Sequence, residues 1–106
     1  MTGKEKEDVP IACSLSSPEY QTRIRRFAIL NRDFLLKSCR LELGLELTYS
    51  LAATEELRDL VRLEEECCPF LRFQLQPRET SITLSITVPD SARDSVDVLL
   101  QPFSAI

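Results

Sequence analysis

The sequence predicts an α+β protein, a two-layer sandwich in which one partly antiparallel sheet carries helices on one face. Two observations lead to this prediction. Stretches in which every second residue is apolar alternate with stretches in which apolar residues recur every three to four positions; these are the periods of strands and of amphipathic helices. The predicted strands are also apolar on one side only, so a single layer of helices would cover them. The expected order of elements is β-α-β-α-β-β-α.

The chain of 106 residues has the length of one domain. Residues 1–8 are polar, and we expect them to form a disordered N-terminal tail. Residues 9–106 are expected to form a single α+β domain.

The first half of the chain is expected to form a strand, a long helix and a second strand. Alternating apolar positions over residues 9–15 predict a short strand. Residues 17–40 predict a helix, with Ser17 as its N-cap and Pro18 in the first helical position. Strict alternation over residues 41–49 then predicts a strand with one buried face and one face open to water.

The second half is expected to form a helix, a hairpin and a last helix. The helical period returns over residues 54–67. Residues 69–76 and 81–88 predict the two strands of an antiparallel hairpin, joined by the turn sequence PRET. The last helix is expected to begin after its cap, Ser91, with an apolar stripe that runs to Phe103.

The two long predicted helices carry opposite charge. Residues 17–40 contain six basic and two acidic side chains, a net charge of +4, whereas residues 52–68 contain six acidic and two basic side chains, a net charge of −4. We expect their flanks to pair side by side or to be solvated; a basic surface for RNA or for an anionic ligand is the alternative. The whole chain has a formal charge of −4, so no nucleic-acid partner is expected.

Several absences narrow the function. The chain has no histidine and only two glycines, which excludes His-dependent catalysis, His-ligated metals and a glycine-rich phosphate loop. We therefore expect a binding protein rather than an enzyme. No apolar run approaches the roughly 18 residues of a membrane span, and the N-terminus lacks an apolar leader. The expected location is cytoplasmic, with no membrane partner.

The stretch LEEECCPFLRF, residues 63–73, carries the main functional hypothesis. Pro69 disfavours helical conformation at Cys68, so the helix should end there and allow the sulfurs of Cys67 and Cys68 to converge. Glu64 continues the apolar stripe, and a buried carboxylate needs a metal, an arginine of the basic helix or a proton. Thiolates select soft ions. The sequence therefore predicts a site for Zn, Cu(I), Hg or As(III), with Cys67 and Cys68 as ligands and Glu64 as a ligand or a neighbouring carboxylate.

Other interpretations stay open. In a chain without an export signal, we expect Cys13, Cys39 and the adjacent pair to be reduced, and free cysteine is also a common core residue. A thiol-dependent enzyme is disfavoured, because the pair lies at a helix C-terminus after three glutamates. The alternative function is a non-enzymatic interaction module, a homodimer with structural cysteines. It would use the open sheet face or the exposed apolar positions Ile29 and Leu36.

The same stretch resembles a family of small, mostly uncharacterised bacterial proteins. The shared pattern is E-x-x-C-C-P-F-L-x-F after an amphipathic helix, and the likeness extends to the SPEY helix start and into the hairpin. Such proteins are sometimes encoded beside heavy-metal resistance functions, so the resemblance implies a bacterial origin and favours metal binding. It implies no activity and no catalytic residues. The matching residues are Glu64, Cys67, Cys68, Pro69, Phe70, Leu71 and Phe73.

Overall fold

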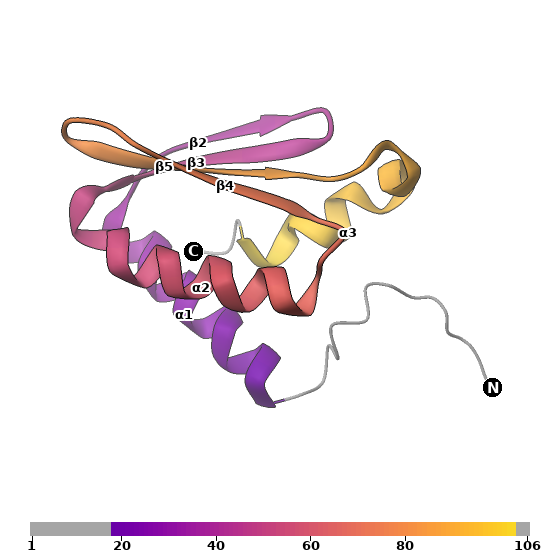
Figure 1. Cartoon of the computed structure of the whole chain (residues 1–106), viewed down its shortest axis with the longest axis horizontal. Coiled ribbons are helices and arrows are strands. Elements are labelled where there is room, and N and C mark those ends of the chain that lie inside the picture. The colour runs from indigo at the N-terminus through magenta and orange to yellow at the C-terminus, as the bar shows by residue number, and fades with distance from the viewer. Residues whose placement is uncertain (1–17, 104–106) are drawn as a thin grey trace.

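The computed structural model describes residues 18–103, which form three α-helices and a four-stranded antiparallel sheet (Figure 1). This confirms the predicted α+β class. Short 3-10 helices precede α2 and flank α3. In chain order the main elements are α1 (Pro18–Phe34), β2 (Leu35–Leu41), β3 (Gly44–Ser50), α2 (Thr54–Cys67), β4 (Arg72–Pro77), β5 (Ser81–Thr87) and α3 (Val96–Leu100).

The strand order across the sheet is β2-β3-β5-β4, and every neighbouring pair is antiparallel. In Figure 1 the helices lie along one side of this sheet. The central strands bury every second side chain toward the helices, which is the predicted pattern of one buried and one open face. The buried set is Leu45, Leu47, Tyr49, Ile82, Leu84 and Ile86.

The predicted helix over residues 17–40 is wrong in its C-terminal part. Helix α1 ends at Phe34, and the next seven residues form β2, an edge strand that pairs with β3. Local sequence does not show this strand, because its residues are exposed and do not alternate. Hydrogen bonding along β3 outweighs the weak local preference for continuing the helix.

The predicted strand over residues 41–49 is also displaced, because Glu42 and Leu43 form the turn between β2 and β3. Gly44 begins β3 at a close approach of two backbones. A Cβ atom at this position would lie 2.6 Å from the carbonyl oxygen of Ile86 on β5. Glycine is therefore the residue that lets these two strands pair in this register.

The remaining predictions have mixed outcomes. Helix α2 and the hairpin of β4 and β5 are confirmed, although β4 begins at Arg72 rather than at residue 69. In the predicted last helix only Val96–Leu100 is α-helical, and the segments Asp90–Ser95 and Gln101–Phe103 are 3-10 helices. The predicted tail (residues 1–8) and the predicted strand (residues 9–15) lie outside the described residues.

A C-terminal 3-10 turn closes the core against α1. The ring of Phe103 makes edge-to-face contacts with Phe27 and Phe73, at centroid distances of 5.1 and 5.7 Å. Buried Asn31 donates a hydrogen bond from Nδ2 to the Phe103 carbonyl at 2.9 Å, and its Oδ1 accepts one from the Tyr49 hydroxyl. These bonds satisfy polar groups inside the core and connect α1, β3 and the C-terminal turn.

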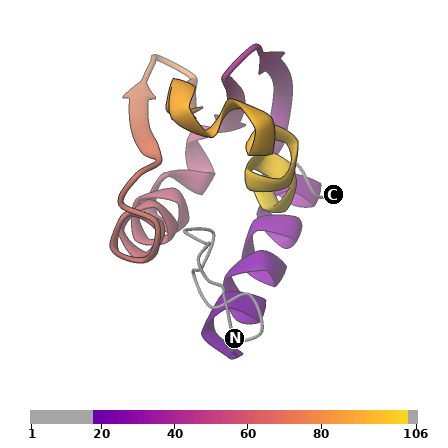
Figure 2. The ribbon, with the colours of Figure 1, turned by 90° about the vertical axis from the view of Figure 1, so that its right-hand side faces the viewer.

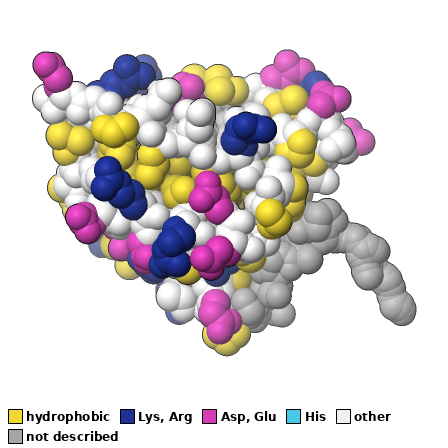
Figure 3. Space-filling view, in the orientation of Figure 1, with side chains coloured by type: hydrophobic (Ala, Val, Ile, Leu, Met, Phe, Trp, Pro, Cys, Tyr) yellow, Lys and Arg dark blue, Asp and Glu magenta, His cyan; other side chains and the backbone are white. Residues whose placement is uncertain are grey.

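Helices α1 and α2 pair through their opposite charges, which is one of the two outcomes expected from the sequence. Arg26 donates from Nε and Nη2 to the two carboxylate oxygens of Glu56 at 2.8 and 2.9 Å, and from Nη2 to Asp59 at 2.8 Å. Basic and acidic side chains are intermingled on the face shown in Figure 3. No helix among residues 18–103 is long and apolar enough to cross a membrane.

Candidate functional site

Helix α2 ends at the cysteine pair. Cys67 is its last residue, and Cys68 has left helical conformation, with φ −128° and ψ 72°. The Cys68 N–H still donates to the Glu64 carbonyl at 2.7 Å, and the Leu71 N–H donates to the Cys68 carbonyl at 3.1 Å. The predicted end of the helix before Pro69 is thereby confirmed, and the chain turns at once toward β4.

The two cysteines differ in environment. Cys67 is half-buried and is not part of a disulfide. Cys68 lies in the core, 8% exposed, and is disulfide-bonded. The expectation of a reduced thiol is therefore wrong for Cys68 in this structure. Cys39 is a free, exposed thiol on β2, and Cys13 lies outside the described residues.

Glu64 finds one of its three predicted partners, an arginine of the basic helix. The Nε atom of Arg23 on α1 donates to Oε2 of Glu64 at 2.8 Å. Arg23 is 8% exposed and Glu64 is 4% exposed, so the ion pair lies inside the protein. Among the described residues, the Nη2 atom of Arg23 is buried without a hydrogen-bond partner. The guanidinium therefore retains a donor for a further acceptor.

Both residues of the ion pair influence the pKa of the neighbouring Cys67 thiol. Burial raises the pKa of the Cys67 thiol above its ordinary value, and the carboxylate of Glu64 raises it further. The charge and hydrogen bonding of Arg23 lower the same pKa, but they offset only part of the rise. Burial likewise raises the pKa of Glu64, and Arg23 counters it. Cys67 is consequently a protonated thiol near neutral pH rather than an activated nucleophile.

Tyr20 completes the site on the α1 side. The guanidinium carbon of Arg23 lies 5.8 Å from the centre of the Tyr20 ring, within the range of a cation–π contact. Burial and the nearby Glu64 carboxylate raise the pKa of the Tyr20 hydroxyl. The site thus consists of residues from two helices, with Tyr20 and Arg23 on α1 and Glu64 and Cys67 on α2.

Sequence reasoning did not select Arg23, although a signal was present. Arg23 lies four residues before Phe27 and seven before Leu30, so it occupies the same stripe of α1 as these core residues. A charged residue on an apolar stripe needs a buried partner. Glu64 is the corresponding charged residue on the apolar stripe of α2, so the two residues together predict the pair.

The described residues do not form a complete set of metal ligands. No group of three or more His, Cys, Asp or Glu residues that could hold a metal occurs within residues 18–103. Glu64 and Cys67 are brought together, but the carboxylate is engaged by Arg23 and the Cys68 sulfur is in a disulfide.

The sequence matches no model of a known protein family, and it matches no curated protein and no solved structure. The resemblance to bacterial proteins with the CCPFLxF pattern stays a prediction. The function is therefore argued from the residues of the site.

Proposed function

We propose that the protein binds one soft metal or metalloid ion, of the class of Zn, Cu(I), Hg or As(III), through the reduced thiolates of Cys67 and Cys68. The observation that carries the proposal is the non-helical conformation of Cys68 directly after the last residue of α2. On a regular helix, adjacent side chains point about 100° apart. The chain turn at Cys68 removes this restriction, so both sulfurs can bind one ion.

Electrostatics favours a cation at this place. Burial keeps the Cys67 thiol protonated, and a bound soft cation provides the positive charge that stabilises a thiolate. The Arg23–Glu64 pair is neutral as a unit, so it does not repel that cation. The spare Nη2 donor of Arg23 can bond to a thiolate sulfur. Glu64 then acts as the carboxylate that positions Arg23, rather than as a ligand.

Binding requires reduction of the disulfide at Cys68. Two molecules of an external thiol, such as glutathione, supply the two electrons and two protons that convert the disulfide into two thiols, and these two molecules become one external disulfide. The reduced chain therefore offers Cys67 and Cys68 together, whereas the oxidised chain offers Cys67 alone.

Native mass spectrometry of anaerobic protein tests the proposal. Reduced protein would be offered Zn, Cu(I) or As(III) in the presence of excess glutathione as a competing thiol, and oxidised protein would be offered the same ions without any thiol, so that its disulfide stays intact. We expect one retained ion per chain in the reduced state and none in the oxidised state. Cys67→Ser should abolish retention, and so should the double Cys67→Ser, Cys68→Ser variant.

The matched control is Cys39→Ser, which removes an exposed thiol of β2 and should retain the ion. Circular dichroism would establish that each variant is folded, because Cys68 is a core residue. Retention by the folded double variant would overturn the proposal. Absence of retention by reduced wild-type protein would also overturn it.

A further inference from the structure

Strand β2 is an exposed sheet edge. It pairs with β3 on one side and has no strand on its other side among the described residues. Six of its seven residues are exposed. The backbone groups along such an edge form hydrogen bonds readily with another strand.

Apolar side chains surround this edge. Leu36 and Leu41 on β2 are 63% and 43% exposed, and Val98 on α3 is also exposed. Exposure of Leu36, and of Ile29 on α1, agrees with the sequence-based prediction. In Figure 2, β2 and α3 lie on one side of the molecule, and α2 and β4 lie on the other.

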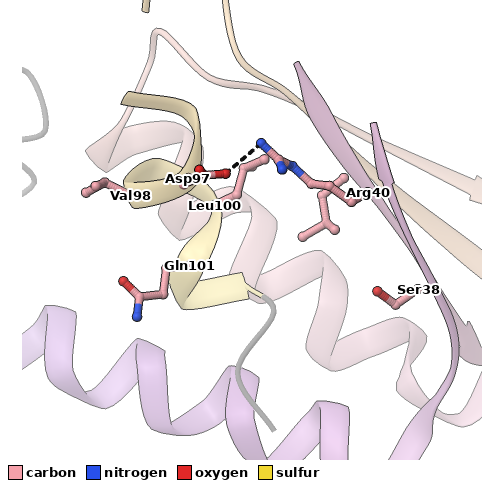
Figure 4. A pocket seen from close by; sticks show the side chains of 7 residues that line it. Ser38, Arg40, Asp97, Val98, Leu100 and Gln101 are labelled. Carbon is pink, nitrogen blue, oxygen red and sulfur yellow. Dashed lines mark ion pairs between the residues drawn. The ribbon is translucent and has the colours of Figure 1, made fainter. Parts of the chain in front are cut away.

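A groove of about 470 Å³ separates β2 from α3 (Figure 4). Leu45, Val98 and Leu100 form much of its lining, and Arg40 of β2 pairs with Asp97 of α3 at 2.9 Å. The helices thus leave the inner side of β2 partly open. Apolar surface beside an open strand edge is typical of a protein interface.

We propose that β2 is a dimerisation strand, which pairs antiparallel with β2 of a second copy of this chain. The two sheets would then form one continuous sheet, and the second copy would cover the adjoining groove. The proposal is independent of metal binding, because it uses none of the site residues on α1 and α2.

A second copy suits this edge because the strand is complementary to itself. The ladder between β2 and β3 is regular from Lys37 to Leu41, after an irregularity between Leu35 and Lys37. Antiparallel pairing of this regular stretch with its own copy requires only a two-fold axis. The axis would pass through Cys39, the middle residue, and would place each Lys37 opposite Leu41 of the second copy.

This register avoids charge conflict. Lys37 lies opposite a leucine, which can pack along its aliphatic stem. Arg40 lies opposite Ser38 of the second copy, and its charge is already balanced by Asp97. No two charges of like sign are directly opposed.

Charge substitutions at Leu41 test the pairing, with sedimentation velocity over a range of protein concentrations as the measurement. Leu41→Arg would oppose Lys37 of the second copy twice per dimer, so we expect a dimerisation constant about tenfold weaker or more. Leu41→Glu would oppose the same lysine with a negative charge and should preserve or strengthen the dimer. The difference between the two variants should shrink at high salt.

A short bismaleimide that joins two thiols tests the register, because directly paired residues hold their Cβ atoms about 5 Å apart. We expect covalent dimers of wild-type protein, none of Cys39→Ser, and undiminished dimers of Cys67→Ser, which removes the other described cysteine that is not part of a disulfide. A monomer at every concentration would overturn the proposal and would indicate that the edge is unused or is covered by another segment of the chain. Equal dimerisation of the Leu41→Arg and Leu41→Glu variants would place the interface elsewhere.

Discussion

Arg23 and Glu64 form a buried ion pair between α1 and α2, with Nε and Oε2 separated by 2.8 Å. The two residues are 41 positions apart in the sequence. Their contact fixes the end of α2 against α1 at the place where the cysteine pair begins. The candidate thiol site is therefore positioned by a contact between helices, in addition to the local turn at Pro69.

Removing one partner of this pair should destabilise the fold. In Glu64→Gln the guanidinium of Arg23 stays buried without a counter-charge, and breaking buried pairs in this way costs about 3–5 kcal/mol. We expect a corresponding decrease in the free energy of unfolding, measured by urea denaturation. The control is Glu66→Gln on the same helix, where the carboxylate contacts Arg62 at the surface and little change is expected.

The double variant Arg23→Met, Glu64→Met distinguishes two contributions to stability. One is the cost of leaving a single buried charge without its partner, and the other is the net contribution of the intact ion pair. Replacing both charges by apolar side chains leaves no buried charge, so its stability should be closer to wild type than that of Glu64→Gln. If Glu64→Gln proves as stable as the Glu66→Gln control, the ion pair does not hold the two helices together.

The alkylation rate of Cys67 should depend on the same pair. Iodoacetamide reacts with thiolate, and burial raises the pKa of Cys67. The rate should therefore be low at neutral pH and rise about tenfold per pH unit until the raised pKa is reached. Glu64→Gln removes a negative charge and should accelerate the reaction at fixed pH, whereas Arg23→Gln should slow it. Mass spectrometry of modified peptides gives the rates.

Cys39 in the same sample serves as an internal reference, because its exposed thiol lies on β2. Substitutions at Arg23 and Glu64 should change the ratio of the Cys67 alkylation rate to the Cys39 alkylation rate. The rate of Cys39 itself should stay the same. Fast alkylation of Cys67 at neutral pH would contradict the raised pKa and would revive the interpretation as a reactive thiol.

Stability should fall at alkaline pH because of Tyr49. Its fully buried hydroxyl donates to Asn31, and burial raises its pKa above the ordinary value of 10.0. The unfolded chain therefore loses the phenolic proton first, so this contribution is complete below pH 10 and declines as pH rises above it. Tyr49→Phe should cost about 1–3 kcal/mol at neutral pH, through the lost hydrogen bond.

The measurement is the free energy of unfolding from neutral to alkaline pH. Tyr49→Phe should flatten the alkaline decline relative to wild type, because phenylalanine does not titrate. An identical slope in the two proteins would show that Tyr49 does not cause the decline.

Gly44→Ala should weaken the sheet. The new Cβ would lie 2.6 Å from the Ile86 carbonyl oxygen, so β3 and β5 would have to separate. Overpacking of this kind costs about 1–3 kcal/mol. Thermal unfolding would measure the loss, with Ser85→Ala on the open face of β5 as the control. Equal melting temperatures for the two variants would contradict the close approach.

The sequence by itself determined the features that depend on local pattern. The period of α2, the alternation in the hairpin of β4 and β5, and the end of the helix before Pro69 each follow from residues within one turn or one strand. The opposite charges of α1 and α2 are also visible in the sequence, and pairing of the two helices was one of the two outcomes expected from them. Such signals survive in the folded protein because tertiary contacts reinforce them.

Only the tertiary structure decided the features that depend on distant residues. Strand β2 exists because β3 provides a hydrogen-bonding partner, although its own side chains are exposed and carry no alternating pattern. The choice of Arg23 as the partner of Glu64 required α1 and α2 to meet in one particular alignment. Packing selects among partners that local sequence leaves equivalent, because a buried charge is tolerated only where the fold brings its counter-charge within hydrogen-bonding distance.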